Sequence, residues 1–311
     1  MLCVFGGARE AAATSTPITL GGASSYGLLL GTNETLTSNG LVIKGNSNSS
    51  VGATTTGALG LSGSDSVNLS GSLTVTGNAY VDGTPNVSGS GSYSVSGSII
   101  SQSMTAIDAA AYSASTAAGA LSANLSVSGN AINVTSSSNS IVIKAVQNAS
   151  ENVLTISSLS LTNGSITFDD NGYAGAKFIV NVTGAFSMTN AAVIKAINGA
   201  SDDDIIFNIE GTGTTVNLTG NSSTAIVGTI LAPQRNVTLG GGGSLTGALI
   251  AGVKNAGTSY TVNQAGGGYN ITTLGYTPRT VVNTPEPSTL ALFGAGGLAL
   301  LVAGRRRRTK A

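Results

Sequence analysis

The sequence predicts a mainly β protein: an irregular β-solenoid with one flanking α-helix, followed by a C-terminal transmembrane helix. Between residues 67 and 95, Val, Leu and Tyr alternate with small polar residues, which is typical of half-buried strands. Four glycines fall six residues apart in this stretch, at 71, 77, 83 and 89. Evenly spaced glycines indicate repeated corners, so the coils would stack around a narrow apolar interior. A β-sandwich gives similar statistics and stays open as the alternative.

One alanine-rich segment interrupts the strand pattern and predicts the helix, over about residues 103–125. Its apolar residues step by three and four along a single face: Met104, Ile107, Ala111, Ala114, Ala118, Leu121 and Leu125. Ser103 is positioned to cap the N-terminus. Because the stripe consists mostly of small residues, it suits close packing against a sheet.

After the helix the pattern returns to strands. The segments KFIVNVTG (177–184) and DIIFNIEG (204–211) repeat one order: an apolar run, Asn, an apolar residue and a glycine two residues later. Three more strands are expected at Ile226–Leu231, Asn236–Leu239 and Ser244–Ala251, separated by Pro233 and by Gly240–Gly243. The glycine run lacks the lysine of a phosphate-binding loop, so a corner is the better interpretation. The predicted solenoid domain covers residues 14–277, and residues 278–284 form a linker.

Composition excludes several classes of function. The chain has no His, and Cys3 is the only cysteine, which leaves no Ser-His-Asp or Cys-His machinery and no ordinary zinc site. Residues 11–284 hold 7 Lys and Arg against 11 Asp and Glu, a poor match for nucleic acid. We therefore expect no enzyme activity, no cofactor and no metal.

Carboxylates remain the candidates for two less favoured sites. A glycan hydrolase would need a carboxylate pair, drawn from Asp65, Asp82, Asp108, Glu151, Asp169, Asp170, Asp202, Asp203, Asp204 and Glu210. No aromatic residues flank them to form a sugar cleft. The loops Asp169–Gly172 and Asp202–Asp204 carry oxygens that suit calcium, but neither has a known ligand spacing. Solvated turns are the preferred interpretation of both loops.

The C-terminus combines an apolar run with a cluster of cations. Residues 290–304 contain only Leu, Ala, Val, Phe and Gly, and Arg305, Arg306, Arg307 and Arg308 follow at once. A helix over 288–304 would be just long enough to cross a bilayer. The positive-inside rule places the arginines, as a stop signal, in the cytoplasm and everything before the helix outside.

With Pro285, Glu286 and Pro287 ahead of the helix, residues 285–311 resemble the PEP-CTERM sorting signal of Gram-negative bacteria. The resemblance implies cleavage near Pro285–Pro287 by an exosortase in the inner membrane. The product, anchored only transiently in that membrane, would be released or attached to the cell surface. Such proteins usually accompany exopolysaccharide production.

The N-terminus fits export only in part. Its apolar stretch, Leu2–Ala8, is short and lacks a basic front. We interpret residues 1–13 as the remnant of a truncated signal peptide, with cleavage between Ala8 and Ala13.

The body also resembles a known family over roughly residues 17–277. The segments FIVNVTG, IIFNIEG, GTILAP and SLTGALIAG, with the Ala-rich helix upstream, are similar to the choice-of-anchor A domain, an adhesive domain of secreted bacterial proteins. The same order of pieces resembles the ice-binding domain that lays a helix along a β-solenoid. In the strand that Ile205–Ile209 would match, ice-binding relatives typically carry several aromatic residues, whereas this chain has only Phe207.

These observations lead to one functional hypothesis with two alternatives. The chain would be a secreted adhesive or structural protein of an exopolysaccharide matrix or biofilm, in contact with polysaccharide or surface proteins. Ice binding is the first alternative, although the sequence contains no long series of Thr-x-Thr repeats. A glycan-acting hydrolase is the remote one. The ligand-binding residues stay undefined at this point.

Overall fold

The computed structural model describes residues 18–32, 34–44, 59–62, 65–84, 86–146, 151–173, 175–201, 204–253 and 260–273. The chain separates into two compact units, Met1–Pro278 and Arg279–Ala311, and every described residue belongs to the first. The predicted signal-peptide remnant (1–13), linker (278–284) and sorting tail (285–311) lie outside the described residues. Within these residues, no helix combines the length and apolar character needed to span a membrane.

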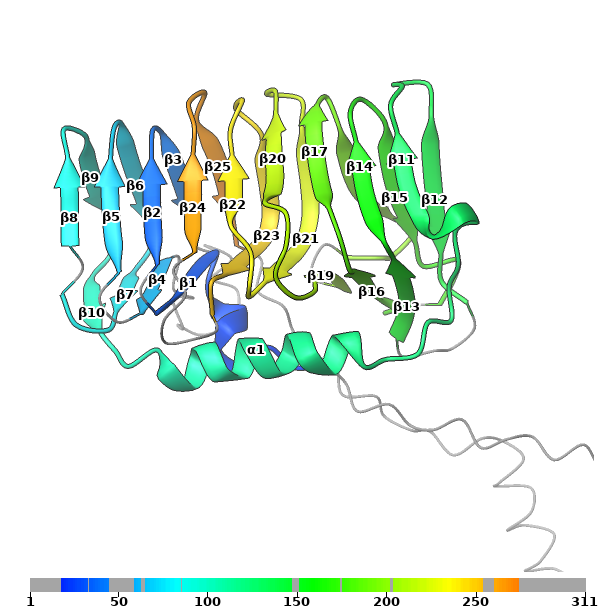
Figure 1. Cartoon of the computed structure of the whole chain (residues 1–311), viewed down its shortest axis with the longest axis horizontal. Helices are drawn as coiled ribbons and strands as arrows, with labels where there is room; N and C mark the ends of the chain where they lie inside the picture. Colours follow the sequence, from blue (N-terminus) through cyan, green and yellow to red (C-terminus); the bar gives the residue numbers. More distant parts are fainter. Residues whose placement is uncertain are drawn as a thin grey trace, which may run out of the picture. The chain divides into compact units, whose positions relative to one another are not determined.

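The described body is a parallel β-solenoid with three faces (Figure 1). All strand pairs in it are parallel, which rules out the β-sandwich alternative. One sheet of nine strands forms the face that we call the ladder face. In spatial order it contains β11 (Ala131–Val134), β14 (Ser158–Leu161), β17 (Phe186–Asn190), β20 (Val216–Gly220), β22 (Val237–Leu239), β24 (Thr261–Gln264), β2 (Thr35–Ser38), β5 (Ser66–Leu69) and β8 (Asn86–Gly89).

A second sheet of sixteen strands covers the other two faces. The helix face contains β13 (Glu151–Ile156), β16 (Lys177–Val182), β19 (Ile205–Ile209), β1 (Leu28–Thr32), β4 (Leu59–Ser62), β7 (Ala79–Val81) and β10 (Ile99–Ser101). The third face contains β12 (Ser140–Lys144), β15 (Ser165–Asp169), β18 (Val193–Ile197), β25 (Tyr269–Thr272), β3 (Leu41–Lys44), β6 (Ser72–Thr76) and β9 (Ser92–Val95). Two long strands, β21 (Ala225–Ala232) and β23 (Ser244–Ala251), run through both faces.

The chain does not visit the coils in spatial order. Residues 28–101 build the coils at one end, and α1 (Thr105–Gly119) then runs along the solenoid to the opposite end (Figure 1). From there the chain winds back, so the last coil meets the first. At this seam β24 pairs with β2, β23 with β1 and β25 with β3. Neighbouring strands at the seam are therefore more than two hundred residues apart in sequence.

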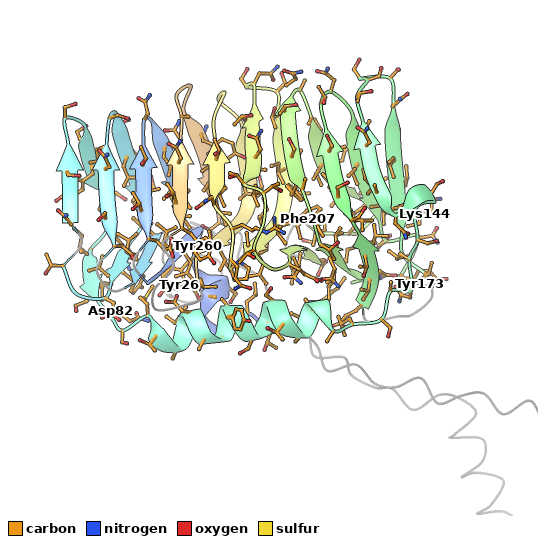
Figure 2. All side chains as sticks on the ribbon, viewed as in Figure 1. Tyr26, Asp82, Lys144, Tyr173, Phe207 and Tyr260 are labelled. Carbon is orange, nitrogen blue, oxygen red and sulfur yellow. The ribbon has the colours of Figure 1, made fainter. Side chains whose placement is uncertain are left out.

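Alternating apolar residues fill one continuous interior. The predicted inward residues Val67, Leu69, Leu73 and Val75 are buried, as are the alternate residues of the ladder-face strands other than β8. Val87 and Tyr93 of the same alternation are instead 44% and 54% exposed, in the end coil that contains β8 and β9. Aromatic rings pack edge to face in the coils of β15 to β19, where the Phe168 ring centroid lies 5.0 Å from that of Phe178 and 5.8 Å from that of Phe207. Figure 2 shows Phe207 inside the body. Such pairs contribute about 0.5–1.5 kcal/mol each beyond their burial.

The helix is shorter than predicted. It spans Thr105–Gly119 rather than 103–125, and Met104, not Ser103, is the N-cap residue, with no side-chain capping hydrogen bond. It ends early because the chain joins the sheet: the backbone N–H groups of Asn124 and Leu125 both donate to the carbonyl of Val153. Its predicted apolar face is correct as far as the helix extends, and Ala111, Ala114 and Ala118 are buried against the helix face.

The two repeated segments seen in the sequence are neighbouring coils. Strands β16 and β19 pair in register, which places Asn181 beside Asn208. Both amides are fully buried beneath α1, where Asn181 Nδ2 donates to the carbonyl of Ala118 at 2.8 Å. Asn208 Nδ2 donates to the carbonyl of Ser115 at 3.0 Å, and the Ser115 hydroxyl donates back to Asn208 Oδ1 at 2.6 Å. These bonds fix the helix on an otherwise apolar surface.

The predicted glycine corners are confirmed. Gly77, Gly83 and Gly89 all have positive φ angles and stand where the chain leaves one strand for the next. The glycine run at 240–243 joins β22 to β23, and a Cβ on Gly241 would lie 1.4 Å from the carbonyl oxygen of Gly220 in the neighbouring coil. The run is therefore a stacked corner and not a phosphate loop.

Candidate binding face

The ladder face presents one aligned row of small polar side chains. In each of its strands the apolar residues point inward, so the residues between them point outward. The parallel register brings the central outward residues of all nine strands into one line: Asn133, Ser160, Ser187, Asn217, Thr238, Asn263, Thr37, Asn68 and Ser88. Because neighbouring strands lie ~4.8 Å apart, the row repeats a hydroxyl or amide group at that spacing.

A second row runs beside the first on the same face. Ser66, Thr35 and Thr261 are in register there, and Asn86 extends the line at one end. Outward residues on one strand stand ~6.6–7 Å apart, since side chains on a face recur every second residue. Over these four strands the two rows form a two-dimensional array of hydrogen-bond donors and acceptors. Serine, threonine and asparagine can each both donate and accept.

The array carries no charge. None of the nine strands of the ladder face contains Asp, Glu, Lys or Arg. The ionisable residues just before three of these strands, Glu34, Asp65 and Arg235, are each at most 2% exposed. The third face differs, since Lys195 and the half-exposed Val142 project from it. Of the two faces that α1 leaves open, the ladder face is therefore the more uniform.

Arg235 stabilises the corner that leads into β22. Its guanidinium donates to the carbonyls of Gly211 at 2.8 Å, Thr214 at 3.0 Å, Glu210 at 2.6 Å and, more weakly, Thr183 at 3.5 Å. These carbonyls belong to the two preceding coils, so one side chain ties three coils together. Burial lowers the pKa of Arg235 from its ordinary value. The sequence reasoning did not single out this residue, although an isolated Arg in so uncharged a body was a signal.

Glu34 occupies the seam between the first and last coils. Its carboxylate accepts the backbone N–H of Tyr260, and the Thr35 N–H donates to the Tyr260 carbonyl at 3.0 Å. Burial, followed by the nearby carboxylates of Asp65 and Asp108, raises the pKa of Glu34 to about 9, against the lowering effect of the Tyr260 N–H. A carboxyl with that pKa is protonated and uncharged at neutral pH. The sequence reasoning missed Glu34 as well.

Two of the described candidate carboxylates, Asp82 and Glu151, accept backbone hydrogen bonds. Asp82 Oδ2 accepts the N–H of Met104 at 3.1 Å, and Glu151 Oε1 accepts the N–H of Ile18 at 3.0 Å, so both are structural acceptors that join distant segments of the chain. Figure 2 places Asp82 and Lys144 at opposite ends of the body. Among the described residues, no three acidic, His or Cys side chains are grouped to hold a metal.

The acidic loop at 169–172 is a pair of Asx turns. Asp169 accepts the Asn171 N–H at 2.8 Å and the Asn198 amide at 3.0 Å, and these bonds lower the pKa of Asp169. Asp170 accepts the Gly172 N–H at 3.0 Å. In the second loop, Asp204 accepts the Ser201 N–H at 3.3 Å, while Asp202 and Asp203 lie outside the described residues. The remaining predicted site residues, Pro285–Pro287 and Arg305–Arg308, also lie outside them.

The architecture and the uncharged polar face define a class: a helix-flanked parallel β-solenoid with one uniform polar face. The chain belongs to the family described as "Putative Ice-binding-like adhesive domain", which matches residues 4–263. Residues 283–308 match the PEP-CTERM protein-sorting motif. This match supports export, exosortase sorting and a surface or extracellular location. The narrower name, choice-of-anchor A, is not the description of the matching family.

Two solved structures share the fold. One is an ice-binding protein from an Antarctic bacterium, Flavobacteriaceae, with 17% identity, a TM-score of 0.52, and coverage of 88% of this chain and 52% of that chain. The other is a glycosylated ice-binding protein from an Arctic yeast, with 16% identity, a TM-score of 0.51, and coverage of 89% and 99%. At these identities the likeness concerns the fold alone. No curated protein sequence matches the chain significantly.

Proposed function

We propose that this chain is a non-enzymatic adhesive protein of an extracellular polysaccharide matrix, and that the ladder face is its binding surface. The observation that carries the proposal is the aligned row of Asn, Ser and Thr side chains from Asn133 to Ser88, without a charged residue on any of its strands. A polysaccharide presents hydroxyl groups along an extended chain, and a linear array of donors and acceptors can pair with them repeatedly. Each contact is weak, and a long row adds many of them.

The lack of charge supports the same ligand class. An uncharged face neither attracts nor repels an acidic polymer over long range, so binding would depend on short-range hydrogen bonds and be insensitive to salt. In the export route that we propose, an exosortase cleaves near Pro285–Pro287 after helix 288–304 has paused in the inner membrane. The narrower assignment to choice-of-anchor A adhesins, and a role in biofilm, belong to this proposal.

Ice binding is the second candidate, because the ladder face repeats polar groups at the regular spacing of a parallel sheet. The composition of the central row favours the adhesive function. Of its nine positions four are Asn, three are Ser and only Thr238 and Thr37 are Thr, so the row is not an ordered threonine array. A glycan hydrolase has the least support, since several of its candidate carboxylates accept backbone N–H groups.

Co-sedimentation tests these alternatives with the full chain against the producer's extracellular polysaccharide, with growing ice as a parallel phase. We expect saturable retention on polysaccharide and exclusion from ice. The double variant Thr37→Leu/Asn263→Leu removes two adjacent hydrogen-bonding side chains from the central row and should weaken retention. Thr246→Leu/Thr272→Leu makes the matching change at two paired positions on the third face and should leave retention intact. Uptake into ice, sensitive to the first variant only, would instead favour ice binding on the same face.

A further inference from the structure

One end of the solenoid is open. Strands β8, β9 and β10 terminate the ladder face, the third face and the helix face, and each pairs on one side only, with β5, β6 and β7. Three described strand edges with unpaired backbone N–H and C=O groups therefore lie around the same end. This is the end that carries β8 and β10 in Figure 1.

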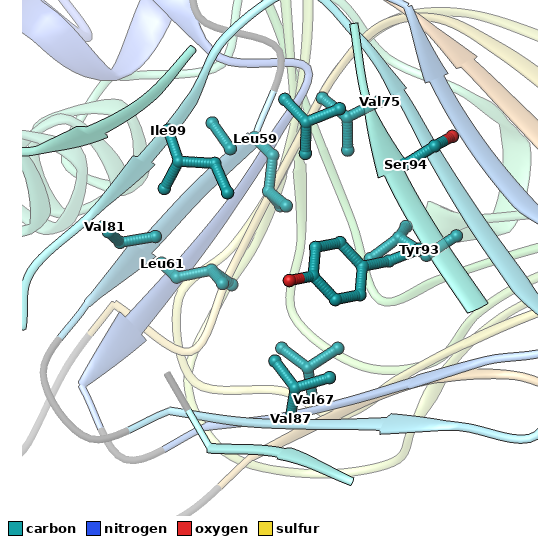
Figure 3. Close-up of a pocket in the computed structure, with 12 residues that line it drawn as sticks. Leu59, Leu61, Val67, Val75, Val81, Val87, Tyr93, Ser94 and Ile99 are labelled. Atoms are coloured by element: carbon teal, nitrogen blue, oxygen red, sulfur yellow. The ribbon is translucent and has the colours of Figure 1, made fainter. Parts of the chain in front are cut away.

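The apolar interior is exposed within this ring of edges. Val87, Tyr93 and Ile99 are in register with the buried residues Val67, Leu73 and Ala79, so they point inward. They nevertheless remain 44%, 54% and 57% exposed, because none of the coils that the structure describes lies beyond them. With their neighbours they line a cavity of about 70 Å³, and Figure 3 shows the Tyr93 ring beside it. Most of its lining residues are aliphatic.

The opposite end is covered in part by the chain itself: residues 124–127 lie against β13, while β11 and β12 each pair on one side only and a cavity of about 280 Å³ lies beside Val142. Leu125 and Val127, which follow α1, pack against the core there. Asn124 extends the cover along β13: its Nδ2 donates to the Glu151 carbonyl at 3.0 Å, and its Oδ1 accepts the Val153 N–H at 2.7 Å. Lys144 also projects at this end, from β12 (Figure 2). The two ends of the solenoid are therefore not equivalent.

The open end lacks the usual protection of a free edge. Natural sheets place lysines or other charges on edge strands to prevent pairing with another chain. From Gly83 to Ile107, which includes all three edge strands, the sequence contains no Asp, Glu, Lys or Arg. Strand edges without charged residues, arranged around an exposed apolar core, favour association with another polypeptide chain.

We propose that two copies of this chain associate through their open ends to form a closed, two-fold symmetric dimer. A two-fold axis perpendicular to the solenoid axis sets each edge strand antiparallel to one from the second copy, so that their backbone groups can pair. Val87, Tyr93 and Ile99 of both copies would then form one continuous core. The absence of charge makes the end self-complementary, because no like charges are brought together.

A second copy suits this end better than an extended peptide does. A peptide would add one strand to one edge and leave the other two edges and the cavity exposed. Another open end has three edges at the same spacing around an apolar centre. The opposite end does not present the same three edges, since residues 124–127 lie against β13, and a two-fold axis that joins the two open ends uses both of them, so association stops at two copies.

Sedimentation equilibrium of the full chain over a concentration series tests the proposal. We expect a species of twice the chain mass of 30.4 kDa at high concentration. Tyr93→Lys/Ile99→Lys should abolish it, because four lysines would be buried at the junction while each stays solvated in the monomer. The matched control is Val142→Lys on β12, a half-exposed apolar residue at the opposite end, which should leave the dimer intact. A chain that stays monomeric throughout the series would overturn the proposal.

Hydrogen–deuterium exchange of the unaltered chain gives an independent readout. We expect amides of β8, β9 and β10 to gain protection as the concentration rises, while those of β11 do not change. This measurement decides the question if the double variant fails to fold, as judged by circular dichroism. Association through the apolar tail would occur equally in all variants and would not protect the amides of β8, β9 and β10. The exchange measurement therefore distinguishes it from association through the open end. Association without protection at β8–β10 would contradict the proposed dimer.

Discussion

At the scale of single residues, buried polar groups hold the coils of this solenoid together. The Arg235 guanidinium donates hydrogen bonds to carbonyls of two other coils, and the side-chain amides of Asn181 and Asn208 donate hydrogen bonds that hold α1 on the helix face. None of these roles was predicted from the sequence. The reason is physical: each depends on which coil stacks on which, and local pattern does not contain that information. The alternation of apolar residues, by contrast, is local and predicted the interior correctly.

Glu34 should make the stability of the protein depend on pH. Its folded-state pKa of about 9 exceeds the ordinary value of 4.5, so the folded state holds a proton that the unfolded state releases. The free energy of unfolding therefore falls as pH rises from about 4.5 to about 9 and is unaffected by this group above that range. Glu34→Gln keeps an acceptor for the Tyr260 N–H without the ionisation. We expect it to raise stability at about pH 8 by on the order of 1–2 kcal/mol, allowing for solvent screening.

Urea unfolding of both proteins at two pH values checks this expectation. The gain from Glu34→Gln should shrink towards zero at about pH 5, where the unfolded carboxyl is itself partly protonated. Asp65 and Asp108, which raise the Glu34 pKa from nearby, stay unchanged in the variant, so the comparison isolates Glu34. An equal effect of the substitution at both pH values would contradict the assignment.

At the scale of elements, two glycines allow the strands that contain the segments GTILAP and SLTGALIA to bend from one face of the solenoid to the next. Gly228 and Gly247 are paired in β21 and β23, where each strand passes from the third face to the helix face. Both have positive φ, of +112° and +141°. A Cβ on Gly247 would lie 2.1 Å from the Gly228 carbonyl oxygen, so neighbouring coils can stack at this bend only without a side chain. The sequence predicted both strands but not the bend within them.

Gly247→Ala should therefore destabilise the fold by about 3 kcal/mol or more, since backbone strain and a steric clash both contribute. Gly129→Ala is the matched control. Gly129 also has positive φ, at +75°, but a Cβ there meets no atom within 4 Å. It should cost only about 1 kcal/mol, the contribution of the backbone conformation alone. Thermal and urea unfolding measure both changes, and similar losses for the two variants would mean that the close stacking at the bend is unimportant.

At the scale of the whole molecule, the solenoid class and the single helix were predictable, but the order of the coils was not. A strand such as Ser244–Ala251 can be recognised from the residue pattern of its own segment. The pairing of β24 with β2 cannot, because it joins residues from opposite ends of the domain. The ladder face was missed for the same reason. Its outward residues are ordinary Ser, Thr and Asn in each strand, and only the register aligns them.

Sorting of the whole chain has a direct test. The product recovered from the producer should be lighter than the full chain and lack Arg305–Arg308, because cleavage near Pro285–Pro287 removes everything after it. Intact mass spectrometry of the native protein measures this. Replacing Pro285-Glu286-Pro287 by three alanines should leave the uncut chain in the membrane fraction. A native product that still contains the four arginines would contradict exosortase processing.

The seam also governs when folding can finish. The first coil pairs early with β4, β5 and β6 but acquires its second neighbour only when residues 260–272 arrive, so hydrogen bonds such as that from the Asn39 N–H to Gln264 Oε1 close loops of 225 residues. Contacts of such sequence separation form slowly, and they cannot form at all while the C-terminal strands are still being synthesised. A nascent chain of this protein thus stays incomplete for most of its synthesis. That delay is an advantage for a polypeptide that has to be threaded through a membrane before it folds.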